Sequence, residues 1–305
     1  MAADPPKIRT DEKVALALGA GGARGLAQIG VIEALEARGL RIAAIAGSSS
    51  GALVGGIHAA GRLPQFRERL ESMRRVDFLR LLAEPALGGG LFRGQRLVEA
   101  MREVVGDPHI ESLPVPFVAV AVDLLRQREV WLRSGPLWTA LRASFAIPGL
   151  FTPAEVHGRE LVDGGLLAPL PIAATRLSDA HRLIAVDMHG WPERPPGAPV
   201  RGNSDGHDAS GSEQPRSRLA RWVERALDER LRDDDGDDIG LTEIMARSLD
   251  TMQAQIARVQ LALDPPELVI RIPRDACLFY EFWRAKELIA LGRAEADKAL
   301  DAAGY

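Results

Sequence analysis

The sequence predicts an α/β fold built around a mostly parallel sheet. Short apolar runs that suit buried strands recur at 14–18, 42–46, 117–124 and 183–187. The first two run directly into glycine-rich turns, and each turn is followed by a segment whose apolar residues have helical spacing. Strand, turn and helix repeated in this order are typical of βα units, in which helices cover a parallel sheet.

The remaining elements follow from the same patterns of apolar spacing. A hairpin partner is expected at 129–132, and short strands at 160–162 and 267–272. Helices are expected at 95–105, 136–145, 241–263 and 280–302. The segment 146–153 is expected to be an irregular loop, too apolar for free solvent, that either walls an acyl pocket or packs on the core.

Composition excludes several classes of protein. The 305 residues can bury a large core, as one big domain or two small ones. A formal net charge of −4 argues against a general nucleic-acid binder. The single cysteine, Cys277, leaves no disulfide framework and no cysteine cluster for zinc. We therefore expect no nucleic-acid partner, no metal ion and no cofactor.

Composition also indicates how the chain is divided into segments and in which cellular compartment the protein is expected. We expect a catalytic core over 12–190, a flexible polar insert with a charged helix over 191–240, and helices and a strand over 241–305 that complete the same domain. The polar segment 1–13 has no secretory signal, and no apolar run reaches membrane-spanning length. We expect a cytoplasmic protein, with any membrane contact peripheral and at the inner face of the membrane.

The segment 42–56 has the order strand, G-x-S-x-G, helix, with Ser49 at the centre of the pentapeptide. This order is the pattern of a nucleophile elbow, in which a tight turn presents the serine hydroxyl at a helix N-terminus. Flanking glycines leave room where a Cβ would clash with the neighbouring strand and helix. The alternative interpretation is a plain strand-to-helix turn in which Ser48 or Ser49 caps the helix.

A glycine-rich loop follows the first strand at 19–25. It lacks the spacing of a dinucleotide site, because Arg24 stands where the third glycine belongs, and it lacks the lysine of a P-loop. The backbone N–H groups of Gly21, Gly22 and Ala23 could instead form an oxyanion hole, with the positive charge of Arg24 beside them. The alternative is a βα turn with no chemical role.

Two further segments carry open interpretations. Asp163 ends a short strand in Asp-Gly-Gly, where it is placed for catalysis but also matches a common turn signal. The segment 63–82 is expected to be one amphipathic helix whose arginines outnumber its acidic residues. That helix either presents a solvated basic face or acts as a lid or interfacial surface that meets anionic lipid.

Taken in order, these motifs resemble those of patatin-like phospholipases. The resemblance rests on Gly21–Gly25, Gly47–Gly51, Ala143-Ser144 with Ile147-Pro148-Gly149, and Asp163-Gly164-Gly165. It covers roughly residues 14–190 and extends more weakly to 263–302, which is similar to the tail of the bacterial cytoplasmic members. Two departures are Ala20, where many members carry a third glycine, and Asp-Gly-Gly in place of Asp-Gly-Ala.

The resemblance implies a three-layer α/β/α sandwich and a serine hydrolase that acts on lipids without a catalytic histidine. Carried over by position, Ser49 is the nucleophile, Asp163 is the base, and Gly21, Gly22 and Arg24 form the oxyanion site. A carboxylate with a pKa near 4 is a poor base for an alcohol. The site must therefore stabilise the oxyanion strongly, or raise the pKa of Asp163 by burial.

The expected activity is that of a phospholipase A, lysophospholipase or carboxylesterase on a lipid or lysophospholipid. Two alternatives stay open. One is a Ser-Asp-His esterase, for which His189, directly after a strand, is the best histidine. The other is a non-catalytic module that binds lipid or a partner, in which Ser49 would be dispensable.

Overall fold

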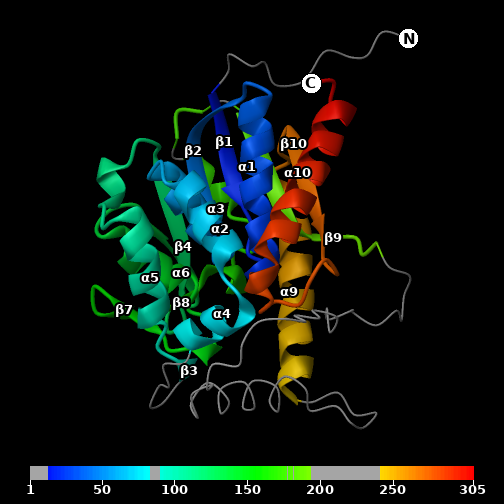
Figure 1. Cartoon of the computed structure of the whole chain (residues 1–305). Helices are drawn as coiled ribbons and strands as arrows, with labels where there is room; N and C mark the ends of the chain where they lie inside the picture. The colour runs from blue at the N-terminus through cyan, green and yellow to red at the C-terminus, as the bar shows by residue number, and fades with distance from the viewer. Residues whose placement is uncertain (1–12, 83–89, 177, 181, 194–240) are drawn as a thin grey trace, which may run out of the picture.

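A computed structural model of the chain describes residues 13–82, 90–176, 178–180, 182–193 and 241–305 (Figure 1). The predicted polar insert and charged helix over 191–240 lie, apart from 191–193, outside the described residues. Within the described part of the chain, no helix has both the length and the apolar character needed to span a bilayer.

A sheet of eight strands forms the centre of the described part of the chain. The strands are β1 (Lys13–Leu18), β2 (Arg41–Ser48), β4 (Phe117–Asp123), β5 (Arg128–Leu132), β7 (Ala154–Val156), β8 (Arg159–Asp163), β9 (Arg182–Gly190) and β10 (Leu268–Pro273). Their order is β10-β9-β1-β2-β4-β8-β7, and β5 also pairs with β4. Because β10, β9, β1, β2 and β4 are parallel, their carboxyl ends meet at one edge of the sheet.

Helices cover both faces of this sheet. The α-helices are α1 (Ala27–Ala37), α2 (Ser50–Ala59), α3 (Leu63–Ser72), α4 (Arg75–Leu82), α5 (Gln95–Val105), α6 (Leu137–Ser144), α7 (Ile172–Thr175), α9 (Leu241–Leu263) and α10 (Ala285–Ala302). The short 3₁₀ helices are η1 (Gly22–Leu26), η2 (Ile110–Ser112), η3 (Gly164–Leu166) and η4 (Phe282–Arg284). Figure 1 shows α1 and α10 side by side across one face, where α2 and α6 also pack, whereas α7 and α9 pack against the other face.

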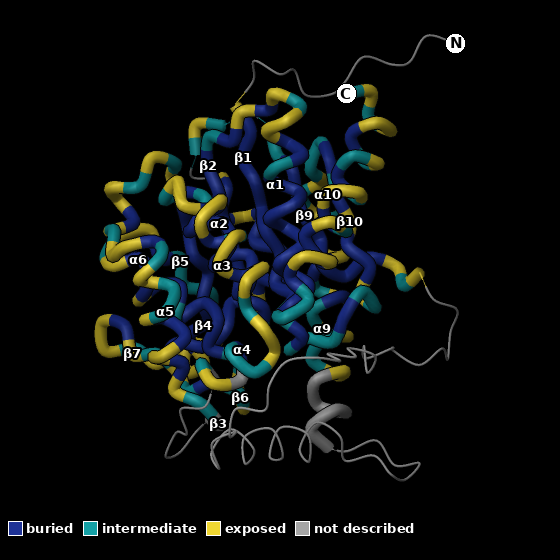
Figure 2. The backbone as a smooth tube through the Cα atoms, in the orientation of Figure 1, coloured by how far each residue is buried: buried dark blue, intermediate teal, exposed yellow. Residues whose placement is uncertain are grey.

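The burial pattern follows from the period of two along each strand. In β1, Leu16 and Leu18 belong to the large core under α1 and α2, and Ala17 belongs to a smaller core with Leu170 and Ile172. Figure 2 shows the central strands of the sheet buried and exposed residues on the outer helices and turns, whereas the strands β5 and β7 are only partly buried. Both faces of the sheet are therefore buried, and the predicted three-layer α/β/α sandwich with a mostly parallel sheet is confirmed.

The C-terminal segment packs tightly against the first helix. A Cβ added to Gly292 of α10 would lie 1.8 Å from the Ala27 carbonyl oxygen, and one added to Gly30 of α1 would lie 2.0 Å from the Ile289 carbonyl oxygen. Helix backbones approach this closely only where no side chain intervenes. With β10 beside β9 in the same sheet, residues 241–305 share one core with the N-terminal strands.

Two local expectations were wrong. The single helix expected at 63–82 is broken between α3 and α4, because Met73 takes an extended conformation with ψ of 127°. Three of its arginines form ion pairs, Arg67 with Glu33 and Glu71, and Arg74 and Arg80 with Asp77. The loop expected at 146–153 contains a strand, β6 (Gly149–Phe151), which pairs with β3 (Gly90–Phe92), far away in the sequence.

Candidate active site

Ser49 sits in a sharp turn between β2 and α2. Its backbone has φ of 55° and ψ of −122°, a conformation that costs about 1–3 kcal/mol for a residue with a side chain. The flanking glycines make the turn possible. A Cβ on Gly47 would lie 2.5 Å from the Ala52 nitrogen, and one on Gly51 would lie 2.2 Å from the Leu18 carbonyl oxygen. This strained strand-to-helix turn has the geometry of a nucleophile elbow.

The side chains of Ser49 and Asp163 meet in the protein interior. The Ser49 hydroxyl donates a hydrogen bond to Asp163 Oδ2 over 2.5 Å. The other carboxylate oxygen, Oδ1, accepts from the Gly165 backbone N–H at 2.7 Å. Ser49 and Asp163 are only 4% and 3% exposed, so the pair is shielded from bulk water.

The sheet register explains why two residues so far apart in sequence come together. Strand β2 runs parallel to β4 and ends with Ser48 opposite Val120. Strand β8 runs antiparallel to β4 and ends with Asp163 opposite Ala121, the next residue of β4. The carboxyl ends of β2 and β8 therefore meet head-on beside β4. Asp163 lies at the end of an antiparallel strand. The sequence pattern did not predict this strand direction.

Burial changes the acidity of Asp163. Removal from water raises the pKa of its carboxyl from 3.8 to about 6, against the opposing hydrogen bonds from Ser49 and Gly165. A carboxylate with this pKa is a stronger base than an exposed aspartate and is still ionised above neutral pH. A serine–aspartate pair without histidine requires a carboxylate whose pKa is raised by burial, and Asp163 has this property.

A second serine holds the elbow in place. The hydroxyl of Ser144, at the end of α6, accepts a hydrogen bond from the Ser49 backbone N–H at 2.9 Å. The same hydroxyl donates to the Val120 carbonyl oxygen of β4 at 2.6 Å. Ser144 is fully buried, so it links the strained turn to the sheet through two hydrogen bonds. In the sequence, Ser144 stands out only as part of the motif Ala143-Ser144, and nothing near it in the chain indicates its role.

The glycine loop lies beside the elbow, but its amides are not all open as the sequence suggested. The Gly21 N–H donates to Ser50 Oγ at 3.1 Å, and the Ala23 N–H donates to the Phe279 carbonyl oxygen at 2.8 Å. Gly22 has φ of 56°, and we find no acceptor for its N–H among the described residues. Two of the three amides considered for an oxyanion hole are therefore bonded to acceptors on Ser50 and Phe279.

The side chain of Arg24 faces a different set of groups. Its guanidinium donates to the Arg274 carbonyl oxygen at 2.6 Å and to Asp250 Oδ1 of α9 at 2.5 Å. Arg24 is 6% exposed, so its charge is neutralised internally by Asp250. The expected positive charge of Arg24 lies next to the loop. Through its hydrogen bonds, the Arg24 side chain connects η1 to α9 and to the segment after β10.

His189, the histidine of the alternative triad, lies among other carboxylates. Its Nδ1 is 3.6 Å from Asp187 Oδ1 and its Nε2 is 3.7 Å from Asp250 Oδ1. Among the described residues we find no contact between this imidazole and the Ser49 hydroxyl. Burial alone would raise the pKa of Asp187, but hydrogen bonds from the His189 side chain and backbone lower it. The structure therefore places His189 in a separate buried cluster.

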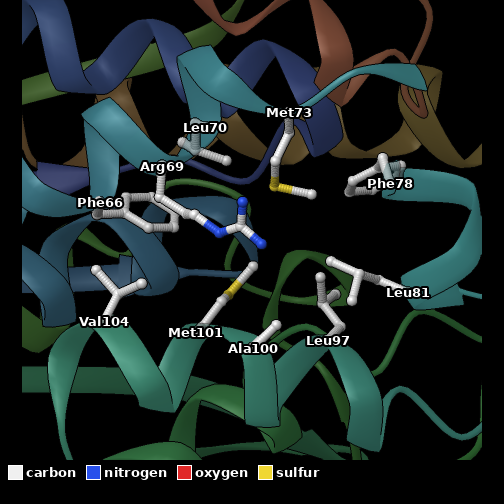
Figure 3. A pocket seen from close by; sticks show the side chains of 10 residues that line it. All are labelled: Phe66, Arg69, Leu70, Met73, Phe78, Leu81, Leu97, Ala100, Met101 and Val104. Atoms are coloured by element: carbon white, nitrogen blue, oxygen red, sulfur yellow. The ribbon is translucent and has the colours of Figure 1, made fainter. Parts of the chain in front are cut away.

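Two cavities in the described part of the chain lie away from Ser49. One, shown in Figure 3, lies between α3, α4 and α5, is lined by apolar side chains and reached by the guanidinium of Arg69, and has a volume of about 20 Å³. That volume holds roughly one water molecule. The other, about 250 Å³, lies at the start of β2 and β4, the opposite edge from the elbow. Neither is a substrate pocket for Ser49.

Fold and site together define an α/β protein with a buried serine–aspartate pair at a strand-to-helix elbow. Comparison with known proteins identifies the family. A sequence model described as patatin-like phospholipase matches residues 16–176, more than half of the chain. An uncharacterized NTE family protein of Mycobacterium tuberculosis is 41% identical over 333 aligned residues, which cover 95% of this chain and 92% of the relative.

Two more distant similarities complete the comparison. Lysophospholipase NTE1 of Cryptococcus neoformans is 35% identical over 185 residues, which cover 58% of this chain and 11% of that protein. The crystal structure of VipD from Legionella pneumophila aligns with 96% of this chain and 67% of its own, with a TM-score of 0.45 and 14% identity. The chain belongs to the patatin-like phospholipase family, and it is by that membership a lipid acyl hydrolase.

Proposed function

We propose that the protein hydrolyses the acyl ester of a phospholipid or lysophospholipid through a dyad of Ser49 and Asp163. The observation that carries the proposal is the 2.5 Å hydrogen bond from the Ser49 hydroxyl to a buried carboxylate. A serine at a strained elbow with a base within hydrogen-bond reach has the arrangement of an activated nucleophile. No histidine takes part in the proposed mechanism.

In the first half-reaction, Ser49 Oγ attacks the ester carbonyl carbon and Asp163 Oδ2 takes the hydroxyl proton. The tetrahedral intermediate then collapses, the C–O bond to the alcohol breaks, and protonated Asp163 gives its proton to the departing alkoxide oxygen. The acyl group remains on Ser49. The raised pKa of Asp163 helps both steps, because the group must first accept a proton and then donate it.

The oxyanion of that intermediate needs hydrogen-bond donors at the elbow. The Gly22 N–H, for which we find no acceptor among the described residues, is the first donor in the proposal, and the N–H of Ser50 at the start of α2 is the second. The Gly21 N–H joins them when the Ser50 hydroxyl turns away from it. Arg24 contributes by holding the loop in place through Asp250 and the Arg274 carbonyl, without touching the oxyanion.

In the second half-reaction, water attacks the acyl-serine. Asp163 takes a proton from that water, a second tetrahedral intermediate forms at the same donors, and its collapse releases the fatty acid and returns the proton to Ser49 Oγ. The choice of a lysophospholipid as substrate is supported by the name of the fungal relative, a lysophospholipase, whose similarity covers 58% of this chain. The family described as patatin-like phospholipase supports the wider class of phospholipid esters.

A fluorophosphonate probe tests the nucleophile directly, because it forms a covalent adduct only with an activated serine. We expect peptide mapping to find the adduct on Ser49, and we expect Ser49→Ala to take up none. Release of fatty acid from lysophosphatidylcholine should disappear in the same variant. Ser72→Ala, at an exposed serine of α3, is the matched control and should behave as wild type. An adduct on another serine, or full activity in Ser49→Ala, would contradict the proposal.

A further inference from the structure

Seven large apolar side chains are exposed in the described part of the chain. They are Leu124, Leu125, Leu167, Trp191, Met252, Val259 and Leu263. Single exposed apolar residues are normal on a protein surface, but a group of them at one place marks an interaction site. Their positions in the fold therefore matter more than their number.

Five of the seven follow strands at the edge of the sheet that holds Ser49 or lie beside residues of the candidate active site, whereas Val259 and Leu263 lie further along α9, toward its C-terminal end. Leu124 and Leu125 directly follow β4 at its carboxyl end, the edge of the sheet where Ser49 follows β2. Trp191 follows β9 at that same edge. We name Leu124, Leu125, Leu167, Trp191 and Met252 the apolar rim.

The other two members of the rim lie next to residues of the site itself. Leu167 follows η3, the turn that begins with the Asp163-Gly164-Gly165 segment. Met252 is on α9 between Asp250, which bonds Arg24, and Gln253, whose side-chain nitrogen would lie 2.8 Å from a Cβ on Gly165. The rim thus flanks the elbow from β4, η3, β9 and α9.

The remaining exposed leucine lies at the opposite edge of the sheet. Leu263 ends α9, and the chain then enters β10 with the Glu267 N–H bonded to the Leu183 carbonyl oxygen near the start of β9. The parallel strands begin at that edge, far from Ser49. Leu263 is 80% exposed and Leu125 is 88% exposed, so the two leucines are matched in exposure and differ in location.

We infer that the apolar rim docks the protein on the surface of a phospholipid bilayer. The inference rests on the proposed function, since a lipid ester held in a bilayer reaches a buried serine most directly from an edge that itself contacts the bilayer. Arginine side chains accompany the rim: Arg258 lies 5.3 Å over the Trp191 ring, and Arg126 follows Leu125 with its side chain half exposed. Arginine and tryptophan both suit the headgroup region, where phosphate and apolar chains meet.

Each rim leucine that enters the bilayer contributes through its apolar area. Removing one such side chain is expected to lower the partition coefficient onto vesicles by roughly tenfold. The rim takes no part in bond breaking. Hydrolysis of an ester dissolved in water should therefore not depend on it, whereas hydrolysis of a lipid in a bilayer should.

Vesicle flotation tests the inference. The full chain carrying Ser49→Ala, which removes turnover, is mixed with vesicles of phosphatidylcholine and phosphatidylglycerol and compared with the same chain carrying Leu125→Ser or Leu263→Ser. We expect Leu125→Ser to lower vesicle binding by roughly tenfold and Leu263→Ser to leave it unchanged. Both substituted leucines are exposed, so both variants should unfold at the temperature of the parent.

A parallel assay separates failure of this inference from failure of the proposed function. With Ser49 intact, Leu125→Ser should hydrolyse a short-chain p-nitrophenyl ester as fast as wild type and lipid in vesicles more slowly. Absence of ester hydrolysis in every variant would count against the proposed function alone. Equal vesicle binding by Leu125→Ser and Leu263→Ser would overturn the inference. A wild-type dimer that Leu125→Ser dissociates would also overturn it, by assigning the rim to a second copy of the chain.

Discussion

At the scale of single residues, the chemistry of the site depends on the burial of Asp163. An exposed aspartate is too weak a base for a serine hydroxyl, and the structure removes this carboxyl from water, which raises its pKa to about 6. The hydrogen bonds from Ser49 and Gly165 stabilise the ionised form and limit the rise. The group is consequently ionised at pH 7 to 8 and is still basic enough to take part in proton transfer.

The pH dependence of kcat/KM follows from this pKa. The base must be ionised, so we expect a plateau above about pH 7 and a fall of about tenfold per pH unit below about pH 6. His189→Ala is the control, because His189 is the histidine of the alternative triad. The acid limb should persist in that variant. Its disappearance in His189→Ala, with the fold intact, would assign the titration to the imidazole.

Ser144 gives a second prediction at this scale. Ser144→Ala removes the acceptor for the Ser49 N–H and leaves that buried donor unpaired. We expect a loss of about 1–3 kcal/mol in the free energy of unfolding and a fall in kcat of roughly 10- to 100-fold, with KM little changed. Ser112→Ala, which removes an exposed serine hydroxyl, is the matched control. Ser144→Ala with wild-type kcat would show that the elbow holds its shape without this bond.

At the scale of elements, the site is held together by segments outside the elbow. Helix α9 reaches it through Asp250, which bonds Arg24, and through Gln253, which lies next to Gly165. Helix α4 reaches it through η4, since Phe78 stacks on Phe282 with ring centroids 4.9 Å apart, and the nearby Phe279 carbonyl accepts from Ala23. The glycine loop is therefore positioned by contacts from both α9 and the segment before α10.

Breaking the contact between α9 and the glycine loop should affect both stability and rate. Asp250→Ala leaves the buried guanidinium of Arg24 without its carboxylate. We expect a loss of about 2–3 kcal/mol in the free energy of unfolding, below the range for fully buried pairs because Asp250 is partly exposed. We also expect a lower kcat, since the loop amides shift.

The matched control for this prediction is Asp264→Ala, which removes the partner of Arg176 in a more exposed ion pair. That change should cost about 0–1 kcal/mol and leave kcat unchanged. Thermal unfolding and ester hydrolysis measure the two effects for both variants. Equal effects of Asp250→Ala and Asp264→Ala would contradict a special role for the contact with Arg24.

At the scale of the whole molecule, the ionised carboxylate of Asp163 lowers the free energy of unfolding at the pH where the proposed dyad is active. The pKa of Asp163 is raised on folding, so its contribution is fully present below the unfolded pKa near 4 and is lost as pH rises through about 6. A rise of about two units corresponds to about 3 kcal/mol of lost stability at pH 8.

Asp163→Asn tests this linkage. The amide keeps an acceptor for the Gly165 N–H and removes the buried charge. We expect the variant to be inactive and, at pH 8, more stable than wild type by up to about 3 kcal/mol, with the difference shrinking toward pH 4. Denaturant unfolding at the two pH values measures it. A constant difference across this range would mean that burial of Asp163 does not shift its pKa on folding.

Local sequence patterns predicted many of the strands and helices. They did not predict which strands pair when the partners lie far apart in the sequence. The strand at 14–18, the elbow at Ser49 and the helices at 95–105 and 241–263 follow from apolar spacing, because each is determined by neighbours in the chain. The pairing of β3 with β6 and the antiparallel entry of β8 depend on residues far away in sequence, so no local pattern could reveal them.

The candidate active site shows the same difference between features set by local sequence and features set by long-range packing. Ser49 and Asp163 stood out through their motifs, and the structure brings their side chains together. The bond from Ser144 to the elbow and the pairing of Arg24 with Asp250 depend on how α6 and α9 pack, which the sequence does not express locally. The glycine loop was predicted correctly in position, whereas the partners of its amides were not.

The central claim is that Ser49 and Asp163 work as a dyad without histidine. The most direct measurement is hydrolysis of a short-chain p-nitrophenyl ester by wild type, Ser49→Ala, Asp163→Asn and His189→Ala, each confirmed to be folded. The account predicts that activity is abolished in the first two variants and retained in His189→Ala. Loss of activity in a folded His189→Ala, or its persistence in Asp163→Asn, would contradict it.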